Sequence, residues 1–182
     1  MANKVLVGVS GGVDSSVSAA ILKEKGYEVT GAFMKNWEDD DGTPYCSVKE
    51  DFLDAARVCD KLNIELIQLN FSKEYKEKVF EYFLASLKEG KTPNPDIFCN
   101  KFIKFEAFYD YAMTNNFDNI ATGHYCQLEQ KNDEYLLKKS KDQSKDQTYF
   151  LKNIKKEVLK RCIFPIGNIE KSEVRKIAKD KK

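Results

Sequence analysis

The chain has 182 residues, of which 42% are hydrophobic and 32% charged, enough for one sizeable core and a small appendage. No apolar run approaches the roughly 18 residues of a membrane span, and no charged leader precedes an apolar segment, so we expect a cytoplasmic protein without membrane contacts. Five cysteines without a C-x-x-C pair and a single histidine argue against a zinc site and against a secreted disulfide framework.

The net charge of +1 conceals an asymmetry along the chain. Residues 1–130 hold 14 Lys and Arg against 21 Asp and Glu, which gives −7, whereas residues 131–182 hold 16 against 8, which gives +8. A basic C-terminal quarter favours a polyanion partner, because lysines neutralise nucleic-acid phosphates whatever the base sequence. A solvated lysine-rich surface has the same composition, so the charge count leaves both interpretations open.

The first element is an apolar strand from Val5 that breaks into a Ser-Gly-Gly-Val-Asp-Ser loop at residues 10–15, where a helix pattern begins. Gly11 and Gly12 have no Cβ, so their backbone can approach a ligand closely, and the helix N-terminus attracts an anion. The loop hydroxyls add donors, and the Asp14 carboxylate could hold a Mg²⁺ ion that bridges phosphates. A capped strand-to-helix turn is the simpler alternative, but this order of strand, loop and helix favours phosphate binding.

Strands and helices alternate up to residue 125. Helical spacing predicts four helices: from Val13 to Gly26, from the capping box at 47–50 to Leu62, over 75–87 and over 101–115. Strands are predicted over 27–34, 64–69 and 119–125. This order predicts an α/β fold with a doubly wound, mostly parallel sheet and helices on both faces. We interpret the acidic run at 38–41 as a solvated loop.

Ligands of such sheets bind beyond the carboxyl ends of the strands, near the point where the strand order reverses. That rule brings the Ser10 loop, Met34 and the Gly123-His124 pair together. A lone histidine is more often a structural group than a catalyst, and we expect His124 to line the nucleotide pocket rather than to perform acid–base chemistry.

The pattern changes after residue 125. A hairpin is predicted around residues 131–134, followed by a short helix near 155–160 and a capped helix from Ser172. We therefore divide the chain into a nucleotide-binding core, residues 1–125, and a basic hairpin and helical extension, residues 126–182. Cys59 falls on the apolar side of a helix and is expected to be a small buried hydrophobe, and structural roles are expected for Cys126 and Cys162.

A second chemical segment covers residues 92–105, where two prolines stiffen a loop around Asn94. This loop is expected to deliver Cys99 to the N-terminus of a helix capped by Asn100. The helix dipole and free N–H groups at such a position lower a thiol pKa and favour the nucleophilic thiolate. The alternative is a half-buried structural cysteine in a turn.

The loop at residues 10–15 lacks the Gly-Lys-Ser/Thr of P-loop enzymes and the G-x-G-x-x-G of dinucleotide sites. It resembles the PP-loop of the ATP pyrophosphatases, which cleave ATP between its α and β phosphates. The chain resembles the tRNA-specific 2-thiouridylases through four further motifs: Phe-Met-Lys-Asn-Trp at 33–37, Thr-Pro-Asn-Pro-Asp-Ile-x-Cys-Asn-x-x-Ile-Lys-Phe at 92–105, Ala-Thr-Gly-His-Tyr at 121–125 and Lys-Asp-Gln-Thr-Tyr-Phe-Leu at 145–151.

This resemblance implies an ATP-dependent tRNA sulfurtransferase. The C2 oxygen of the wobble uridine would be adenylylated, and sulfur from a persulfide-donating relay protein would then replace it, with release of pyrophosphate and AMP. The target base must leave its stack for either step. The implied site residues are, for ATP, Gly8, Val9, Ser10, Gly11, Gly12, Val13, Asp14, Ser15, Met34 and Gly123; for the target base, Asn94, Pro95 and Asp96; for tRNA, Lys145, Asp146 and Gln147; and, as first catalytic cysteine, Cys99.

The family pairs its first cysteine with a second one, in a disulfide formed during the cycle, and that second motif would lie beyond Lys182. The family's further β domains are also absent from this sequence, so we expect an incomplete N-terminal catalytic part that alone adenylylates poorly or not at all and does not turn over. Two alternatives remain open at this point. One is another PP-loop ligase, such as an amidotransferase-type synthetase or a lysidine-forming ligase, and the other is an ATP- and RNA-binding module without turnover.

Overall fold

The computed structural model describes residues 2–37, 48–132 and 134–181. A parallel sheet of five strands forms its centre, in the order β3-β2-β1-β4-β7. The strands are β1 (Lys4–Gly8), β2 (Glu28–Lys35), β3 (Glu65–Asn70), β4 (Asn119–Ala121) and β7 (Cys162–Ile163). The chain builds outward from β1 to β3 and then returns to place β4 on the other side of β1, so the strand order reverses between β1 and β4.

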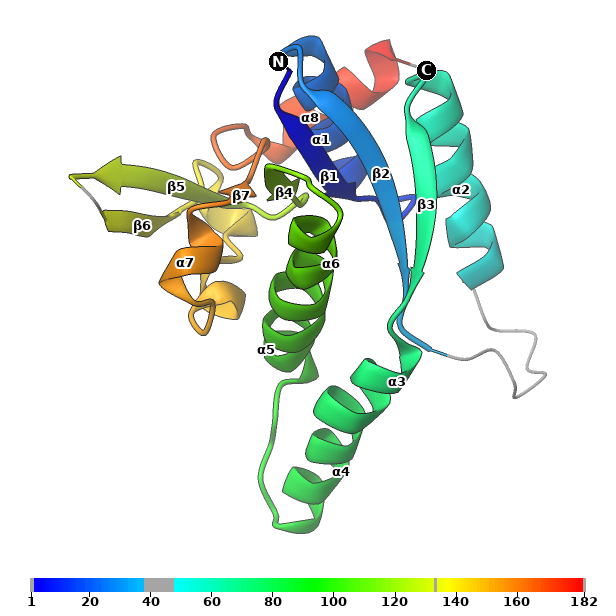
Figure 1. Ribbon diagram of the computed structural model, residues 1–182. Coiled ribbons are helices and arrows are strands. Elements are labelled where there is room, and N and C mark those ends of the chain that lie inside the picture. Colours follow the sequence, from blue (N-terminus) through cyan, green and yellow to red (C-terminus); the bar gives the residue numbers. More distant parts are fainter. Residues whose placement is uncertain (1, 38–47, 133, 182) are drawn as a thin grey trace.

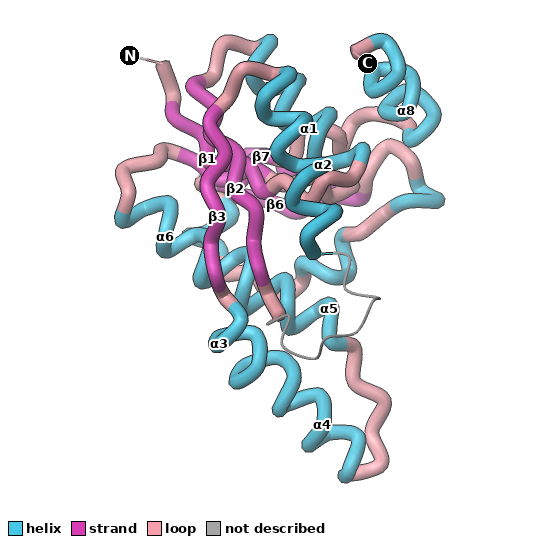
Figure 2. The backbone as a smooth tube through the Cα atoms, turned by 90° about the vertical axis from the view of Figure 1, so that its right-hand side faces the viewer, coloured by secondary structure: helices cyan, strands magenta, loops and turns pink. Residues whose placement is uncertain are grey.

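Helices cover both faces of this sheet, as predicted. Helices α1 (Val13–Glu24) and α2 (Val48–Lys61) lie on one side, and α6 (Phe108–Thr114) lies on the other (Figures 1 and 2). Alternate residues of β1 serve the two sides: Val5 and Val7 belong to the cluster that includes residues of α1 and α2, whereas Leu6 packs in the cluster that includes Phe108. All of these side chains are buried, which explains why β1 is almost entirely apolar.

Two long helical runs contain segments of π-helix. The first runs through α3 (Ser72–Tyr75), the π-helical η1 (Lys76–Phe80) and α4 (Glu81–Lys88). The second runs through α5 (Pro95–Phe98), the π-helical η2 (Cys99–Ala107) and α6. Together α4 and α5 form an arm that extends from the sheet (Figure 1). The helices predicted over 75–87 and 101–115 are therefore confirmed, but they begin earlier than expected, at Ser72 and Pro95.

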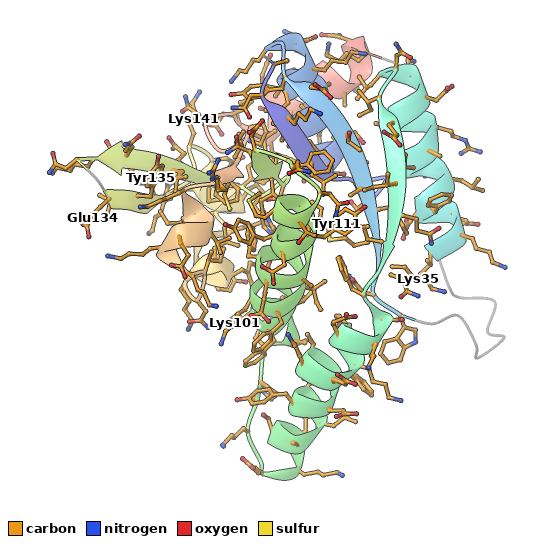
Figure 3. All side chains as sticks on the ribbon, in the orientation of Figure 1. Lys35, Lys101, Tyr111, Glu134, Tyr135 and Lys141 are labelled. Atoms are coloured by element: carbon orange, nitrogen blue, oxygen red, sulfur yellow. The ribbon has the colours of Figure 1, made fainter. Side chains whose placement is uncertain are left out.

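The C-terminal third contains an antiparallel hairpin, β5 (Cys126–Lys131) and β6 (Glu134–Lys139), which projects sideways with Glu134 and Tyr135 near its end (Figure 3). Two 3₁₀ turns follow, η3 (Gln143–Lys145) and η4 (Thr148–Leu151), and then α7 (Lys156–Leu159) and α8 (Lys171–Asp180). Two elements of this third join the core: β7 pairs with β4, and Val174 of α8 packs against Val17 of α1. The domain boundary at residue 125 stays a prediction.

The structure corrects the sequence analysis at several boundaries. The strand predicted over 119–125 ends at Ala121, so Gly123 and His124 lie in the loop after it. The short strand β7 was not predicted. The acidic run at 38–41, Cys46 and the first residue of the capping box, Ser47, lie outside the described residues. Among the described helices, none combines the length and the apolar character that crossing a bilayer requires.

The packing of α1 on the sheet should dominate stability. Leu22 of α1 is fully buried, so Leu22→Ala is expected to lower the free energy of unfolding by about 2–5 kcal/mol through lost burial and a residual cavity. The matched control is Leu84→Ala in α4, because Leu84 is 40% exposed and should cost less than about 1 kcal/mol. Urea unfolding followed by circular dichroism measures both, and equal losses would contradict this account of the core.

Candidate active site

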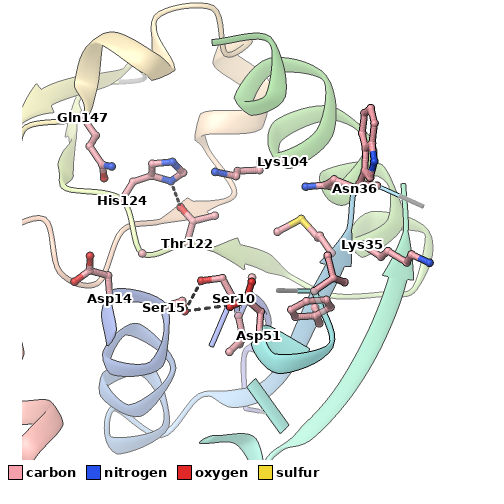
Figure 4. Close-up of a pocket in the computed structure, with 17 residues that line it drawn as sticks. Ser10, Asp14, Ser15, Lys35, Asn36, Asp51, Lys104, Thr122, His124 and Gln147 are labelled. Atoms are coloured by element: carbon pink, nitrogen blue, oxygen red, sulfur yellow. Dashed lines mark hydrogen bonds between the residues drawn. The ribbon is translucent and has the colours of Figure 1, made fainter. Parts of the chain in front are cut away.

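A cavity of about 440 Å³ lies at the carboxyl ends of β1 and β4, where the strand order reverses. Figure 4 shows its wall, which combines the loop after β1, the end of β2, the loop after β4 and one residue of η2. The residues that line it are Gly8, Val9, Ser10, Asp14, Ser15, Phe33, Met34, Lys35, Asn36, Trp37, Val48, Asp51, Lys104, Thr122, Gly123, His124 and Gln147. The cavity therefore brings together the three segments that strand order alone predicted to meet.

The loop after β1 presents the N-terminus of α1 to this cavity. Gly12 is the N-cap residue, and the first backbone bond of the helix runs from the Ser16 N–H to the Gly12 carbonyl at 3.2 Å. The N–H groups of residues 13–15 have no acceptor within the helix, which is the arrangement that binds anions. The Ser15 hydroxyl donates to the Gly12 carbonyl at 3.0 Å and lies 3.2 Å from the Ser10 hydroxyl, so these hydroxyls also brace the loop.

Two glycines allow the close approaches that shape the site. Gly11 has a φ of +78°, and a Cβ there would lie 2.7 Å from the Asp51 carbonyl of α2. A Cβ on Gly123 would lie 2.8 Å from the Ser15 backbone nitrogen, against the first turn of α1. Both distances are shorter than van der Waals contact, so any side chain would displace either α2 or the wall formed by the loop after β4.

Asp14 lies at the edge of the cavity in a polar cluster. Its Oδ1 accepts a hydrogen bond from the Tyr125 hydroxyl at 2.9 Å and another from the Lys171 ammonium at 2.5 Å. Burial and the Asp14 carboxylate raise the pKa of Tyr125, so its hydroxyl stays a donor. Asp51 is a second carboxylate on the wall. The described residues contain no cluster of three His, Cys, Asp or Glu side chains that could hold a metal ion.

The wall formed by the loop after β4 carries a neutral histidine. The Thr122 hydroxyl and His124 Nδ1 share a hydrogen bond of 2.8 Å, and Lys104 extends toward His124 from η2 (Figure 4). Burial and the Lys104 charge both disfavour imidazolium, and they hold the pKa of His124 well below its usual range. His124 lines the cavity, as predicted, and it is neutral at physiological pH.

Several lining residues were not singled out by the sequence analysis. These are Lys35, Asn36, Trp37, Asp51, Lys104 and Thr122. The Asn36 side-chain oxygen is buried and accepts no hydrogen bond from the described residues. An unsatisfied buried acceptor on a cavity wall is suited to a donor group of a ligand. The run at 33–37 was a signal for Asn36 and Trp37, and the run at 92–105 was a signal for Lys104, although no role was assigned to these residues.

The placement of Cys99 differs from the prediction. The helix begins at Pro95 with Asn94 as its N-cap, whose side chain accepts from the Asp96 N–H at 2.9 Å, and Asn100 is not a cap. Cys99 therefore lies past the first turn, and its backbone N–H bonds within the helix. Burial raises the pKa of the Cys99 thiol, Lys104 opposes this and Asp96 adds to it. The expected lowering by a helix N-terminus is wrong.

The residues expected at the target base and tRNA are only partly close to the cavity. Gln147 lines it and accepts from the Tyr125 N–H at 2.9 Å. Asp146 accepts from the Ser140 N–H at 2.8 Å and so anchors the segment after the hairpin. Lys145, residues 94–96 and Cys99 itself do not line the cavity, and neither do Gly11, Gly12 or Val13.

The described cysteines are all free thiols, namely Cys59, Cys99, Cys126 and Cys162. The expected disulfide is therefore not present in the part of the chain that the structure describes. Burial raises the pKa of Cys59 to about 11, and it also raises those of Cys126 and Cys162. These three are core residues, as predicted, and only Cys99 is half-buried.

Comparison with known sequences identifies relatives along almost the whole chain. The sequence model described as "tRNA methyl transferase HUP domain" matches residues 3–182. Proteins named tRNA-specific 2-thiouridylase MnmA from Marinomonas sp. and from Buchnera aphidicola are 57% and 58% identical, each over 97% of this chain but only 45% and 48% of their own lengths. The chain thus spans about half the length of these curated relatives.

Solved structures show the same fold at low identity. One is a 4-thiouridine synthetase–RNA complex with bound ATP, at 17% identity and a TM-score of 0.59 over 98% of this chain and 40% of that one. Another is a predicted subunit of tRNA methyltransferase from Methanocaldococcus jannaschii, at 22% identity and a TM-score of 0.56, which covers 97% of this chain and 74% of that one.

The match of the sequence model covers 180 of the 182 residues, from residue 3 to residue 182. The chain belongs to the tRNA methyl transferase HUP domain family, with tRNA-specific 2-thiouridylases as its curated relatives.

Proposed function

We propose that this chain is the nucleotide-binding and catalytic part of a tRNA sulfurtransferase that converts the wobble uridine to 2-thiouridine. The observation that supports this most is the anion-binding N-terminus of α1 in a cavity of about 440 Å³, in a chain 57% identical to a curated 2-thiouridylase. The ATP in the 4-thiouridine synthetase complex belongs to a protein of the same fold. The choice of substrate rests on the family.

The proposed roles follow from the geometry of the cavity. The N–H groups of residues 13–15 and the Ser10 hydroxyl would hold phosphates, and Met34 and Gly123 would contact the adenosine. Mg²⁺ is commonly held by one or two carboxylates together with nucleotide phosphates, and Asp14 and Asp51 are the carboxylates of the cavity wall that would hold it. When bound, it would neutralise phosphate charge during the transfer.

The reaction divides into three displacements. In the first, the uridine O2 attacks the α-phosphorus of ATP, an O–P bond forms, and pyrophosphate leaves. In the second, the outer sulfur of a persulfide from a relay protein attacks C2, the C2–O bond breaks, and AMP leaves with the oxygen. The Cys99 thiolate would then attack the inner sulfur, so that the S–S bond breaks, 2-thiouridine is released and a disulfide forms between Cys99 and the donor cysteine. Cys99 would supply the thiol on the protein, and residues 94–96 beside it would meet the flipped base.

The basic C-terminal third is proposed to contact the anticodon stem-loop. Its hairpin projects from the body (Figure 1), and Gln147, which follows the hairpin in the chain, lines the cavity. Phosphates of tRNA bound on the hairpin would thereby bring the wobble base toward the site. Residues 145–147 connect the hairpin to the cavity wall. Lysine–phosphate contacts would set position rather than sequence preference.

Nucleotide binding should depend on the contact between Gly123 and α1. Gly123→Ala is expected to weaken ATP binding at least about tenfold, because the added Cβ would push against the Ser15 backbone at the phosphate end. Gly90→Ala is the control for a glycine substitution outside the cavity, since no atom lies within 4 Å of a Cβ there. Gly90, unlike Gly123, has a positive φ, so this control loses stability through backbone strain rather than through the cavity. Calorimetric titration with ATP measures both. Unchanged affinity in a folded Gly123→Ala protein would contradict the proposed phosphate site.

Sulfur transfer should depend on Cys99. We expect Cys99→Ser to lower ATP-dependent sulfur incorporation into tRNA with an unmodified wobble uridine by at least about 100-fold, because serine is a much weaker nucleophile, while ATP binding persists. Cys162→Ala, in the core, should retain activity. The assay uses this chain and a fusion that continues it with the remainder of the Marinomonas relative.

The outcomes separate the parts of this proposal. Full activity of Cys99→Ser would exclude Cys99 as the nucleophile and favour another PP-loop ligase chemistry. ATP binding without thiolation by either protein would contradict the substrate and leave the nucleotide site standing. Thiolation by the fusion alone would assign the missing step to residues outside this chain.

A further inference from the structure

Lys104 is the cation of the cavity that no described residue neutralises. It lines the wall, is half-buried, and makes no hydrogen bond or ion pair with the residues that the structure describes. Two other lysines of η1 and η2 have interaction partners. Lys78 of η1 forms an ion pair with Glu106 at 2.6 Å, and the Lys101 ammonium of η2 lies 4.5 Å from the centre of the Phe102 ring. Lys35, also on the cavity wall, has an interaction partner. A half-buried ammonium without a counter-ion favours an anionic ligand.

The winding of η2 relates Lys104 to Cys99. The two residues are five positions apart, which is the separation that a π-helical hydrogen bond spans, so they lie about one turn apart. In an ordinary α-helix, residues three or four apart share a face and residues five apart do not. The π-helical winding therefore places Lys104 on the same side of the helix as Cys99, one turn further along, where Lys104 lines the cavity.

We propose that Lys104 joins the two halves of the site: its ammonium group binds phosphate in the cavity beside Thr122 and His124, and it also stabilises negative charge on the Cys99 sulfur one turn away. This inference rests on the proposed function, in which Cys99 is the nucleophile, and it adds a residue that favours the reactive form of that thiol. Lys104 would contact the phosphate directly. It would act on Cys99 without contact, because its positive charge favours the thiolate form of that side chain.

The electrostatics of the surrounding groups support this assignment. Lys104 lowers the pKa of Cys99 against the opposing effects of burial and Asp96. The other titratable group that reaches Cys99 is the Tyr75 phenol of α3, on the facing helix, whose own pKa is raised by burial, by Cys99 and by Asp96. Lys104 is thus the cation that opposes burial at this thiol among the described residues.

The test uses two measurements that require neither tRNA nor a sulfur donor. The first is the rate of Cys99 alkylation by iodoacetamide as a function of pH, followed by mass spectrometry of the Cys99 peptide, so that other thiols do not contribute. The second is ATP affinity by calorimetry. The variants are Lys104→Met, which removes the charge, Lys104→Arg, which keeps it, and Lys101→Met, which removes a charge from the same helix at a separate cavity that faces α7 (Figure 3).

We expect Lys104→Met to slow Cys99 alkylation at pH 8 about threefold or more, with the pH profile displaced upward, and to weaken ATP binding about tenfold. Lys104→Arg should restore most of both, and Lys101→Met should change neither. Loss of only one property in Lys104→Met, or equal losses in Lys101→Met, would overturn the joint role. Because both readouts are independent of thiolation, a failure of the proposed tRNA chemistry would leave this result interpretable.

Discussion

The candidate site depends on the contact between the loop after β4 and the first turn of α1. Gly123 lies so close to the Ser15 backbone that no side chain fits between them, and this closeness makes the wall of the cavity continuous with its anion-binding end. Two residues later, the Tyr125 hydroxyl donates to the Asp14 carboxylate, which also holds Lys171 of α8. Elements from opposite ends of the sequence are thereby fixed around one helix N-terminus.

The loop that ends at this helix N-terminus follows β1, an interior strand of the sheet. β1 pairs with β2 on one edge and β4 on the other, and its side chains are buried on both faces of the sheet. A phosphate-binding loop gains from such an anchor, because donors that are already held in place lose little freedom when a ligand binds. The arm of α4 and α5 extends away from this anchor and carries several partly exposed apolar side chains, including Leu84 and Leu87.

The features that could be predicted from the sequence were those carried by a local pattern. The apolar run of β1, the glycines at 11 and 12 and the helical spacing after them specify strand, loop and helix without reference to the rest of the chain. The order of the elements then predicted the position of the cavity. The two-residue strand β7 gave no pattern of its own, because its place in the sheet is set by pairing with β4.

The helix that carries Cys99 was misplaced for a different reason. The prolines at 93 and 95 were interpreted as stiffening a loop, yet proline is favoured at the first position of a helix and asparagine is a good N-cap. Both signals were present at Asn94 and Pro95. Lys104 lies within the run at 92–105, but it was assigned no role, because a lysine in a helix usually faces solvent; the structure places it on the wall of the cavity from η2.

The corrected position of Cys99 changes what distinguishes it from the other thiols. Cys99 does not lie at a free helix N-terminus that could stabilise its thiolate. Burial disfavours the thiolate form at Cys59, Cys126 and Cys162 as well. Cys99 differs because a cation reaches it: Lys104 opposes burial there, whereas the other three described thiols have no cation that lowers their pKa. The proposed nucleophilic role of Cys99 therefore depends on the balance between the burial of this thiol and the charge of the Lys104 ammonium group, which also lines the cavity.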